Sequence, residues 1–216
     1  MGKPSIGQTH QVMSIFSNNI DWTKTNSELL QQFVDDPSWA GRMFFDFVNQ
    51  KRKNLKLLKS DIQISTKVFS TLVLLNSKWG VEVYLGDKFK DWIVPELSEE
   101  IPDFSINLAS YKLTKNMYDK EIRAEIGENN TYTPDEAMAI IFANIYKQPH
   151  GEGGDFENRG LSNIQYVRLK SGDVVVVVAR WDVGACRWCL RSYLLDDDDW
   201  NEGNYVFVRS LPTQVG

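Results

Sequence analysis

Cys186 and Cys189 have the CxxC spacing that occurs in redox and zinc sites, and they are the only cysteines of the chain. A redox pair usually lies at a helix N-terminus, where the helix dipole stabilises the thiolate. Here the pair lies within an expected strand, in which residues three positions apart point to opposite faces. A zinc site needs further ligands, and the chain has only the histidines His10 and His150. We therefore interpret both cysteines as structural thiols and expect no metal site, no cofactor and no disulfide.

Acidic side chains could support a metal-dependent hydrolase together with His150, which lies in the Gly-rich loop of residues 148–154. This loop contains no phosphate-binding glycine pattern. The acidic run at 196–199 does not match the spacing of an EF-hand calcium loop, so we interpret it as a solvated hairpin loop. Further carboxylates are available at Asp119, Glu121 and Glu125. A hydrolase that uses acidic residues and His150 is the first alternative function.

A basic segment lies at residues 51–59, and its cations are Lys51, Arg52, Lys53, Lys56 and Lys59. If a helix continues through this segment, Arg52, Lys56 and Lys59 fall on one side of it, as a nucleic-acid-binding patch requires. Helix C-termini also carry Lys and Arg for a simpler reason, because the helix dipole favours cations there. A nucleic-acid-binding regulator is therefore the second alternative function, beside a solvated helix end.

Arginines and aromatic residues recur along the C-terminal strands in a pattern that favours binding. Residues two apart in a strand share a face, so each strand presents its arginines and aromatics together. If register aligns the strands, one face of the sheet carries Tyr166, Arg168, Arg187, Arg191, Tyr193, Tyr205, Phe207 and Arg209. We expect a non-catalytic binding or interaction protein with a protein partner, and nucleic acid as the alternative partner. An ordinary solvent face, or a second core layer that contains the aromatics, is the competing interpretation.

The elements that must position these side chains are clearest near the C-terminus. Short strands are predicted at residues 163–169, 174–181, 186–194 and 205–209. The gaps between them favour hairpins, so we expect an antiparallel four-strand meander. Thr133-Pro134-Asp135-Glu136 is a capping box with proline at the first helical position. It predicts a helix at 134–147 that covers the sheet.

The whole pattern predicts an α+β protein, in which N-terminal helices precede a mainly antiparallel sheet with one covering helix. Its parts are a loose arm at residues 1–20, a helical segment at 21–60 and a β-rich domain at 68–210. The helical segment contains one helix at 28–34 and another from Pro37 to about residue 51. Further strands are expected at 69–75, 80–85, 106–113 and 121–126, with a helical turn at 88–93.

Composition limits the setting in which this protein works. A net charge of −5 and a pI near 5.1 exclude a general attraction to nucleic acid or to anionic membranes. No apolar run reaches the ~18 residues of a membrane-spanning helix. The N-terminus lacks the apolar core of a signal peptide, and free cysteines suit a reducing compartment. We therefore expect a cytoplasmic protein that does not contact membranes.

Short motifs at residues 84–92, 120–127, 163–167 and 199–209 carry a family resemblance. Through them the segment 68–209, about two thirds of the chain, resembles a family of hypothetical proteins from small-genome, uncultivated bacteria. The N-terminal helices lie outside the resemblance. No activity is assigned to that family, so the resemblance implies no catalytic residues. It implies a bacterial, cytoplasmic origin.

Overall fold

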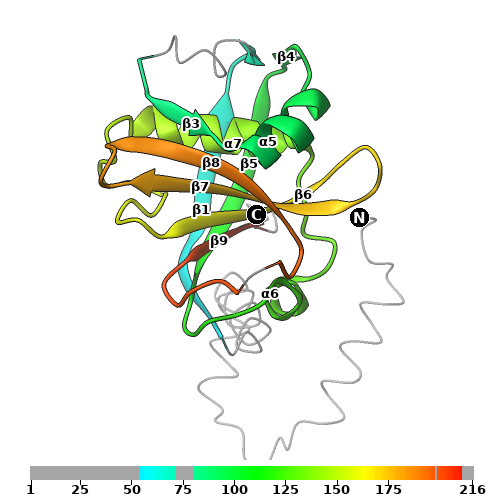
Figure 1. Ribbon diagram of the computed structural model, residues 1–216, viewed down its shortest axis with the longest axis vertical. Helices are drawn as coiled ribbons and strands as arrows, with labels where there is room; N and C mark the ends of the chain where they lie inside the picture. Colours follow the sequence, from blue (N-terminus) through cyan, green and yellow to red (C-terminus); the bar gives the residue numbers. More distant parts are fainter. Residues whose placement is uncertain (1–53, 72–79, 198, 211–216) are drawn as a thin grey trace, which may run out of the picture. The chain divides into compact units, whose positions relative to one another are not determined.

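The computed structural model describes residues 54–71, 80–197 and 199–210, which all belong to the second of two compact units, Arg52–Gly216. The strands are β1 (Leu55–Thr66), β2 (Phe69–Ser70), β3 (Val83–Leu85), β4 (Glu100–Ile101), β5 (Phe104–Leu113), β6 (Ser162–Arg168), β7 (Val174–Asp182), β8 (Arg187–Leu194) and β9 (Tyr205–Arg209). The helices are α5 (Asp87–Trp92), α6 (Asp119–Ile126) and α7 (Pro134–Lys147), with a 3-10 turn at Val94–Glu96. Figure 1 shows their arrangement.

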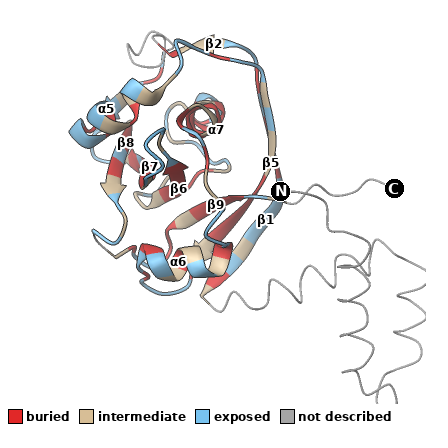
Figure 2. Ribbon diagram, turned by 90° about the vertical axis from the view of Figure 1, so that its right-hand side faces the viewer, coloured by how far each residue is buried: buried red, intermediate tan, exposed pale blue. Residues whose placement is uncertain are grey.

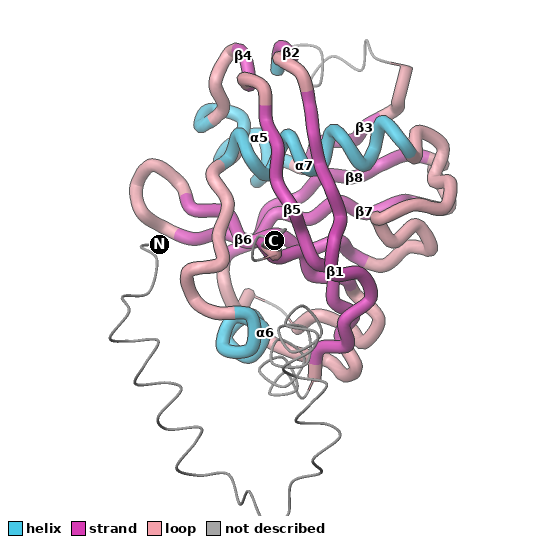
Figure 3. Tube along the Cα trace, turned by 180° about the vertical axis from the view of Figure 1, so that it is seen from behind, coloured by secondary structure: helices cyan, strands magenta, loops and turns pink. Residues whose placement is uncertain are grey.

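One mixed sheet organises the fold, with seven strands in the order β1-β5-β9-β6-β7-β8-β3. The pairs β1–β5, β5–β9, β6–β7 and β7–β8 are antiparallel, whereas β6–β9 and β3–β8 are parallel. A separate pair joins β2 and β4. Figure 3 shows the long β1 and β5 strands side by side on the far side of the view in Figure 1.

The sheet curls around α7, which gives it an inner face toward α7 and an outer face toward α6 (Figure 2). The inner core joins α7 residues such as Ile140 and Ile141 to Val177 and Trp188 of the sheet. The outer core joins Ile122 and Ile126 of α6 to other sheet side chains. Because apolar residues alternate between two covered faces, β7 is buried from Val175 to Ala179.

The capping box predicted at the start of α7 is present. Thr133 Oγ1 accepts a hydrogen bond from Glu136 N at 3.2 Å, and Glu136 Oε2 accepts one from Thr133 N at 2.8 Å. Pro134 stands at the start of the helix, where its missing N–H costs no hydrogen bond. The predicted helix boundaries of 134–147 are therefore confirmed.

The predicted fold class is wrong in two respects. The described chain is mostly sheet, and that sheet is mixed, because the β3–β8 and β6–β9 pairings are parallel within a sheet whose other pairings are antiparallel. The four-strand meander ends after β8, because β9 crosses to the other side of β6 and pairs with it in parallel. The free edge of β8 is taken by β3 instead. A hairpin argument assumes a short gap, and the connection at residues 195–204 is long enough to reach a different partner.

The N-terminal helices of that fold class do not appear, because residues 1–53 lie outside the described chain. Residues 55–60, predicted to end the helical segment, form the beginning of β1. Residues 121–126, predicted as a strand, form most of α6. Ile122 and Ile126 are four apart, a spacing that fits one face of a strand and one face of a helix equally well. The helical turn predicted at 88–93 corresponds to α5.

Candidate functional site

The residues predicted to form one arginine and aromatic surface are divided between the two faces of the sheet. Tyr166 lies in the outer core and Phe207 in the inner core, and both are about 1% exposed. Tyr205 packs against the inner core, whereas Tyr193 packs against the outer one. The structure therefore does not bring the whole set together.

A smaller group of the predicted residues does share the outer face, around Cys189 of β8. Arg187 and Arg191 stand two residues before and after Cys189, on the same side of the strand. Register places Tyr84 of β3 opposite Cys189 on one side and Arg180 of β7 opposite it on the other. We call this group the arginine–tyrosine face, and it consists of Tyr84, Arg180, Arg187, Arg191 and Tyr193.

Contacts within the arginine–tyrosine face hold some of its side chains in place. The Arg187 guanidinium carbon lies 4.9 Å from the centre of the Tyr84 ring, a cation–π distance, and its Nη1 lies 3.6 Å from Glu82. A hydrogen bond to the Tyr193 side chain raises the pKa of Arg191. The Tyr193 ring meets Trp200 edge to face at 5.5 Å. Arg180 is exposed and has no ion pair with a described residue.

Sequence reasoning missed Tyr84 and Arg180. Arg180 follows Val174, Val176 and Val178 at the strand period, so its face could have been read from the sequence. Its position opposite Cys189 depends on the β7–β8 register. Tyr84 joins the face through a parallel pairing between strands that are far apart in the chain, for which no local signal exists.

The CxxC cysteines are separate free thiols. Cys189 is 5% exposed, and burial raises the pKa of its thiol, with Asp182 adding to the effect. A raised pKa keeps Cys189 protonated and unreactive near neutral pH. Cys186 is exposed and lies in the β7–β8 turn, where the Asp182 carboxylate accepts hydrogen bonds from the N–H groups of Gly184 and Ala185.

The acidic residues considered for a metal site are used in other contacts. Asp119 is 1% exposed and accepts hydrogen bonds from the Tyr166 hydroxyl at 2.9 Å and from Trp200 Nε1 at 2.7 Å. Its second oxygen accepts one from Asp196 N at 2.8 Å. Despite these bonds, burial raises the pKa of Asp119 above its ordinary value of 3.8.

Glu121 and Glu125 serve separate contacts. Glu121 pairs with Lys115 at 3.0 Å, and Glu125 accepts a hydrogen bond from Asn54 Nδ2 at 2.7 Å. In the acidic loop, the Asp196 side chain accepts a hydrogen bond from Lys120 N at 3.1 Å, which joins this loop to α6. No group of His, Cys, Asp or Glu side chains in the described ranges is arranged to hold a metal ion.

The Gly-rich loop around His150 is packed against the protein by its glycines. A Cβ atom on Gly151 would lie 2.3 Å from the Trp181 ring, and one on Gly154 would lie 2.3 Å from the Gln148 side chain. Gln148 holds the loop through hydrogen bonds with the backbone of Glu152 and Phe156. Gly151 and Gly154 therefore serve close packing, and the backbone N–H of the exposed His150 donates to the Glu152 carboxylate.

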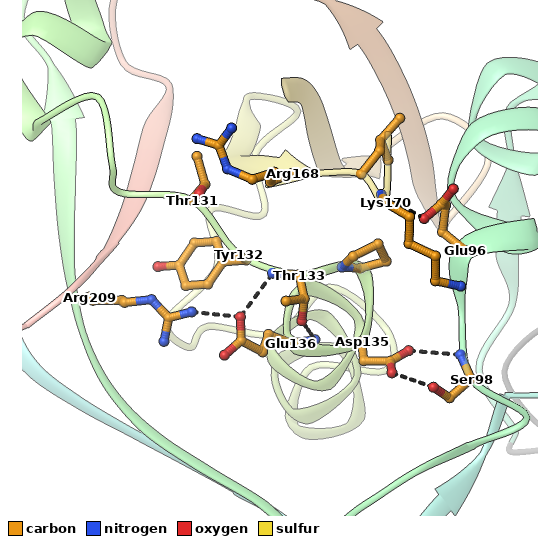
Figure 4. Close-up of a pocket in the computed structure, with 12 residues that line it drawn as sticks. Glu96, Ser98, Thr131, Tyr132, Thr133, Asp135, Glu136, Arg168, Lys170 and Arg209 are labelled. Carbon is orange, nitrogen blue, oxygen red and sulfur yellow. Dashed lines mark hydrogen bonds and ion pairs between the residues drawn. The ribbon is translucent and has the colours of Figure 1, made fainter. Parts of the chain in front are cut away.

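A pocket of about 620 Å³ lies at the start of α7, and Arg168 and Arg209 line it (Figure 4). Arg209 Nη2 donates to Glu136 at 2.6 Å, and its guanidinium carbon lies 5.0 Å from the centre of the Tyr132 ring. Hydrogen bonds from Arg209 and from the Thr133 backbone overcome the effect of burial and lower the pKa of Glu136. Arg168 and Arg209, both predicted as binding residues, thus belong to a different site from the arginine–tyrosine face.

The described part of the basic segment forms a strand and not the predicted helix. Lys51, Arg52 and Lys53 lie outside the described residues. Lys56 and Lys59 lie on β1 and not on a helix, and Lys59 pairs with Asp155.

Comparisons with protein-family profiles, with curated proteins and with solved structures give no match. Within the residues that the structure describes, no helix is long and apolar enough to cross a membrane.

Proposed function

We propose that this chain is a non-catalytic binding protein whose arginine–tyrosine face engages an acidic segment of a protein partner. The observation that carries the proposal is the placement of Arg180, Arg187 and Arg191 around Cys189 on adjoining strands. Arg180 and Arg191 are exposed and form no ion pair with a described carboxylate. In a chain of net charge −5, this local group of cations favours an anionic partner through charge complementarity.

The state of the tyrosines favours a protein segment over a nucleic acid. Binding of single strands relies on aromatic ring faces that are free to stack on bases. Arg187 occupies one face of the Tyr84 ring, which is 37% exposed, and the Tyr193 ring packs against Trp200. The guanidinium groups of Arg180 and Arg191 remain free of ion pairs with described carboxylates. The paired N–H donors of a planar guanidinium group match a carboxylate.

The dimensions of the face limit the partner. Tyr84, Cys189 and Arg180 stand on neighbouring strands, so the face is about 10 Å wide at ~4.8 Å per strand. Arg187 and Arg191 are four residues apart on β8, or about 13 Å at ~3.3 Å per residue. A patch of this size suits a short acidic segment that is held weakly and with strong dependence on salt.

A bacterial, cytoplasmic setting belongs to the same proposal. It is supported by the family resemblance of residues 68–209 and by the free thiols of Cys186 and Cys189, which suit a reducing compartment.

The test uses a fluorescein-labelled decaglutamate peptide as the acidic probe and follows its anisotropy at low and at high salt. We expect salt-sensitive binding that is lost in the Arg180→Ala/Arg191→Ala double variant. The matched control is Lys67→Ala/Lys90→Ala, which removes the same charge from exposed sites elsewhere and should bind normally. Equal loss in both variants, or tighter binding of single-stranded polyuridine than of the peptide, would contradict the proposal.

A further inference from the structure

The strand β1 forms one edge of the seven-stranded sheet, because its only described strand partner is β5. An edge strand turns the N–H and C=O groups of every second residue away from its partner, and these groups can pair with another chain. With 12 residues, β1 is the longest described strand, whereas β3 at the opposite edge has 3. Figure 3 shows β1 running beside β5 along much of its length.

The first half of β1 carries features that discourage pairing with another chain. Its register against β5 shifts between Leu57 and Lys59 and again between Lys59 and Ile62. Irregularities of this kind bend an edge strand, and exposed lysines on an edge repel a second strand. Lys56 and Lys59 are both exposed, and Lys59 pairs with Asp155 in the loop after α7. This half of the edge is therefore protected.

The second half of β1 lacks these features. From Ile62 to Thr66 every residue has its partner on β5 in unbroken register. The stretch contains no charged residue and no proline, and its exposed residues are Gln63 and Ser65. No other described segment forms a backbone hydrogen bond to its open side. A regular, uncharged edge of this kind is a template for the addition of a strand.

The backbone groups at this open edge belong to Gln63 and Ser65. On β5, the Asn107 carbonyl oxygen accepts from Ser210 N at 2.9 Å, so the backbone groups of Asn107 face away from β1. Those of Ile106, its neighbour, therefore face β1, where register sets Ile64 opposite. Since backbone direction alternates along a strand, Gln63 and Ser65 point their N–H and C=O groups outward.

The residues that flank this stretch have opposite charges. Asp61 directly precedes it and Lys67 directly follows it, and both are exposed. Each is three residues from Ile64, so antiparallel pairing of two copies about Ile64 sets Asp61 of each copy opposite Lys67 of the other. Opposite charges across a strand pair are favourable, whereas parallel pairing in the same register would bring like charges together. Lys67 also lies 3.4 Å from Asp103 of its own chain, but its side chain is 91% exposed and remains accessible.

We infer that two copies of this chain associate through residues 62–66 of β1, paired antiparallel about Ile64, which joins their sheets edge to edge. In this register Gln63 of each copy lies opposite Ser65 of the other, and the two residues exchange both of their outward backbone hydrogen bonds. The shortness of the paired stretch predicts weak, concentration-dependent association. The inference is independent of the proposed function, because the arginine–tyrosine face lies on β3, β7 and β8, toward the other end of the strand order.

The test measures the mass of the full chain by sedimentation equilibrium over a series of protein concentrations. A shift from monomer to dimer with rising concentration is expected. Asp61→Lys sets lysine against Lys67 at both ends of the pairing, and Lys67→Asp sets aspartate against Asp61. Either variant alone should weaken dimerisation about tenfold or more, because each end changes from an attractive to a repulsive pair. A chain that stays monomeric at every concentration would overturn the inference.

Mixing the two variants tests the register itself. An equimolar mixture of Asp61→Lys and Lys67→Asp chains restores opposite charges at both ends, so the mixture should dimerise as the original chain does. The control Asp91→Lys makes the same charge change at an exposed site on α5 and should leave association unchanged. A mixture that associates no better than its separate components, or equal weakening in the control, would refute the pairing about Ile64.

A backbone variant tests whether the contact is a strand pairing. Ser65→Pro removes an outward N–H group from the edge, where proline costs no hydrogen bond to β5, and should abolish the dimer. Ser65→Ala keeps that N–H group and is the matched control. The unfolding midpoint of each variant shows that it is folded. Normal dimerisation by a folded Ser65→Pro chain, or loss of the dimer in Ser65→Ala, would contradict the pairing.

Discussion

Replacing Asp119 with alanine should destabilise the fold by about 2–4 kcal/mol, because it leaves the donors around it unpaired. These donors are the Tyr166 hydroxyl at 2.9 Å, Trp200 Nε1 at 2.7 Å and Asp196 N at 2.8 Å. A buried donor without a partner costs about 1–3 kcal/mol. The sum is reduced because the variant also removes a carboxylate whose burial is unfavourable, as the raised pKa of Asp119 indicates.

The pH dependence of this carboxyl group has a definite sign. Burial raises the pKa of Asp119 in the folded protein above its ordinary value of 3.8. At pH values between the unfolded and the folded pKa of Asp119, the folded chain binds more protons than the unfolded chain, so stability falls as the pH rises. The contribution is fully present below pH 3.8 and is lost as the pH rises through the raised pKa. The asparagine side chain of the Asp119→Asn variant cannot titrate. The free energy of unfolding of the original chain, relative to that of this variant, should therefore decrease as the pH rises.

Urea denaturation followed by tryptophan fluorescence measures both effects, because Trp200 lies at the site. Asp91→Ala is the control, since Asp91 is exposed and its change should stay within about 0.5 kcal/mol. A loss below about 1 kcal/mol for Asp119→Ala would show that the three hydrogen bonds do not hold α6 and its loop. A stability difference that rises with pH would refute the raised pKa.

Gly151→Ala should destabilise the fold by about 2–4 kcal/mol, since φ is +73° and the new Cβ would lie 2.3 Å from the Trp181 ring. Gly153→Ala is the control, because a Cβ there would meet nothing within 4 Å. Equal unfolding midpoints for the two variants would contradict this packing. Gln165→Met should raise stability by about 1 kcal/mol or more, because the buried amide has no partner among the described residues, and a loss in the same denaturation assay would count against it. The lowered pKa of Glu136 gives stability that is present above pH 4.5 and lost as pH falls through the folded pKa. Glu136→Gln should remove this dependence on pH in thermal unfolding, and an unchanged acid profile would argue against the Arg209 pair.

Local sequence signals predicted the elements whose causes are local. The helix of residues 134–147 follows from the bonds between Thr133 and Glu136, which need no other part of the chain. The hairpins β6–β7 and β7–β8 follow from short turns. The unbroken apolar run at residues 174–178 is typical of a strand that is covered on both faces, as β7 is.

Pairings between distant segments could not be predicted in this way. β8 pairs in parallel with β3, and β6 pairs in parallel with β9. The residues between the paired strands carry no sequence signal that indicates either pairing. The prediction that one face carries all the arginines and aromatics was wrong for the same reason, because strand register decides on which face a side chain lies. Tyr166 and Phe207 look alike in sequence, yet they belong to opposite cores.

The place of β9 also has a consequence for the order in which the chain can fold. This strand pairs with β5 on one side and β6 on the other, so it joins the β1–β5 strand pair to the rest of the sheet. During synthesis the ribosome releases residues 205–209 after all the other strands, and until then β5 and β6 have open edges. Long-range pairing of this kind is slow and leaves aggregation-prone edges exposed.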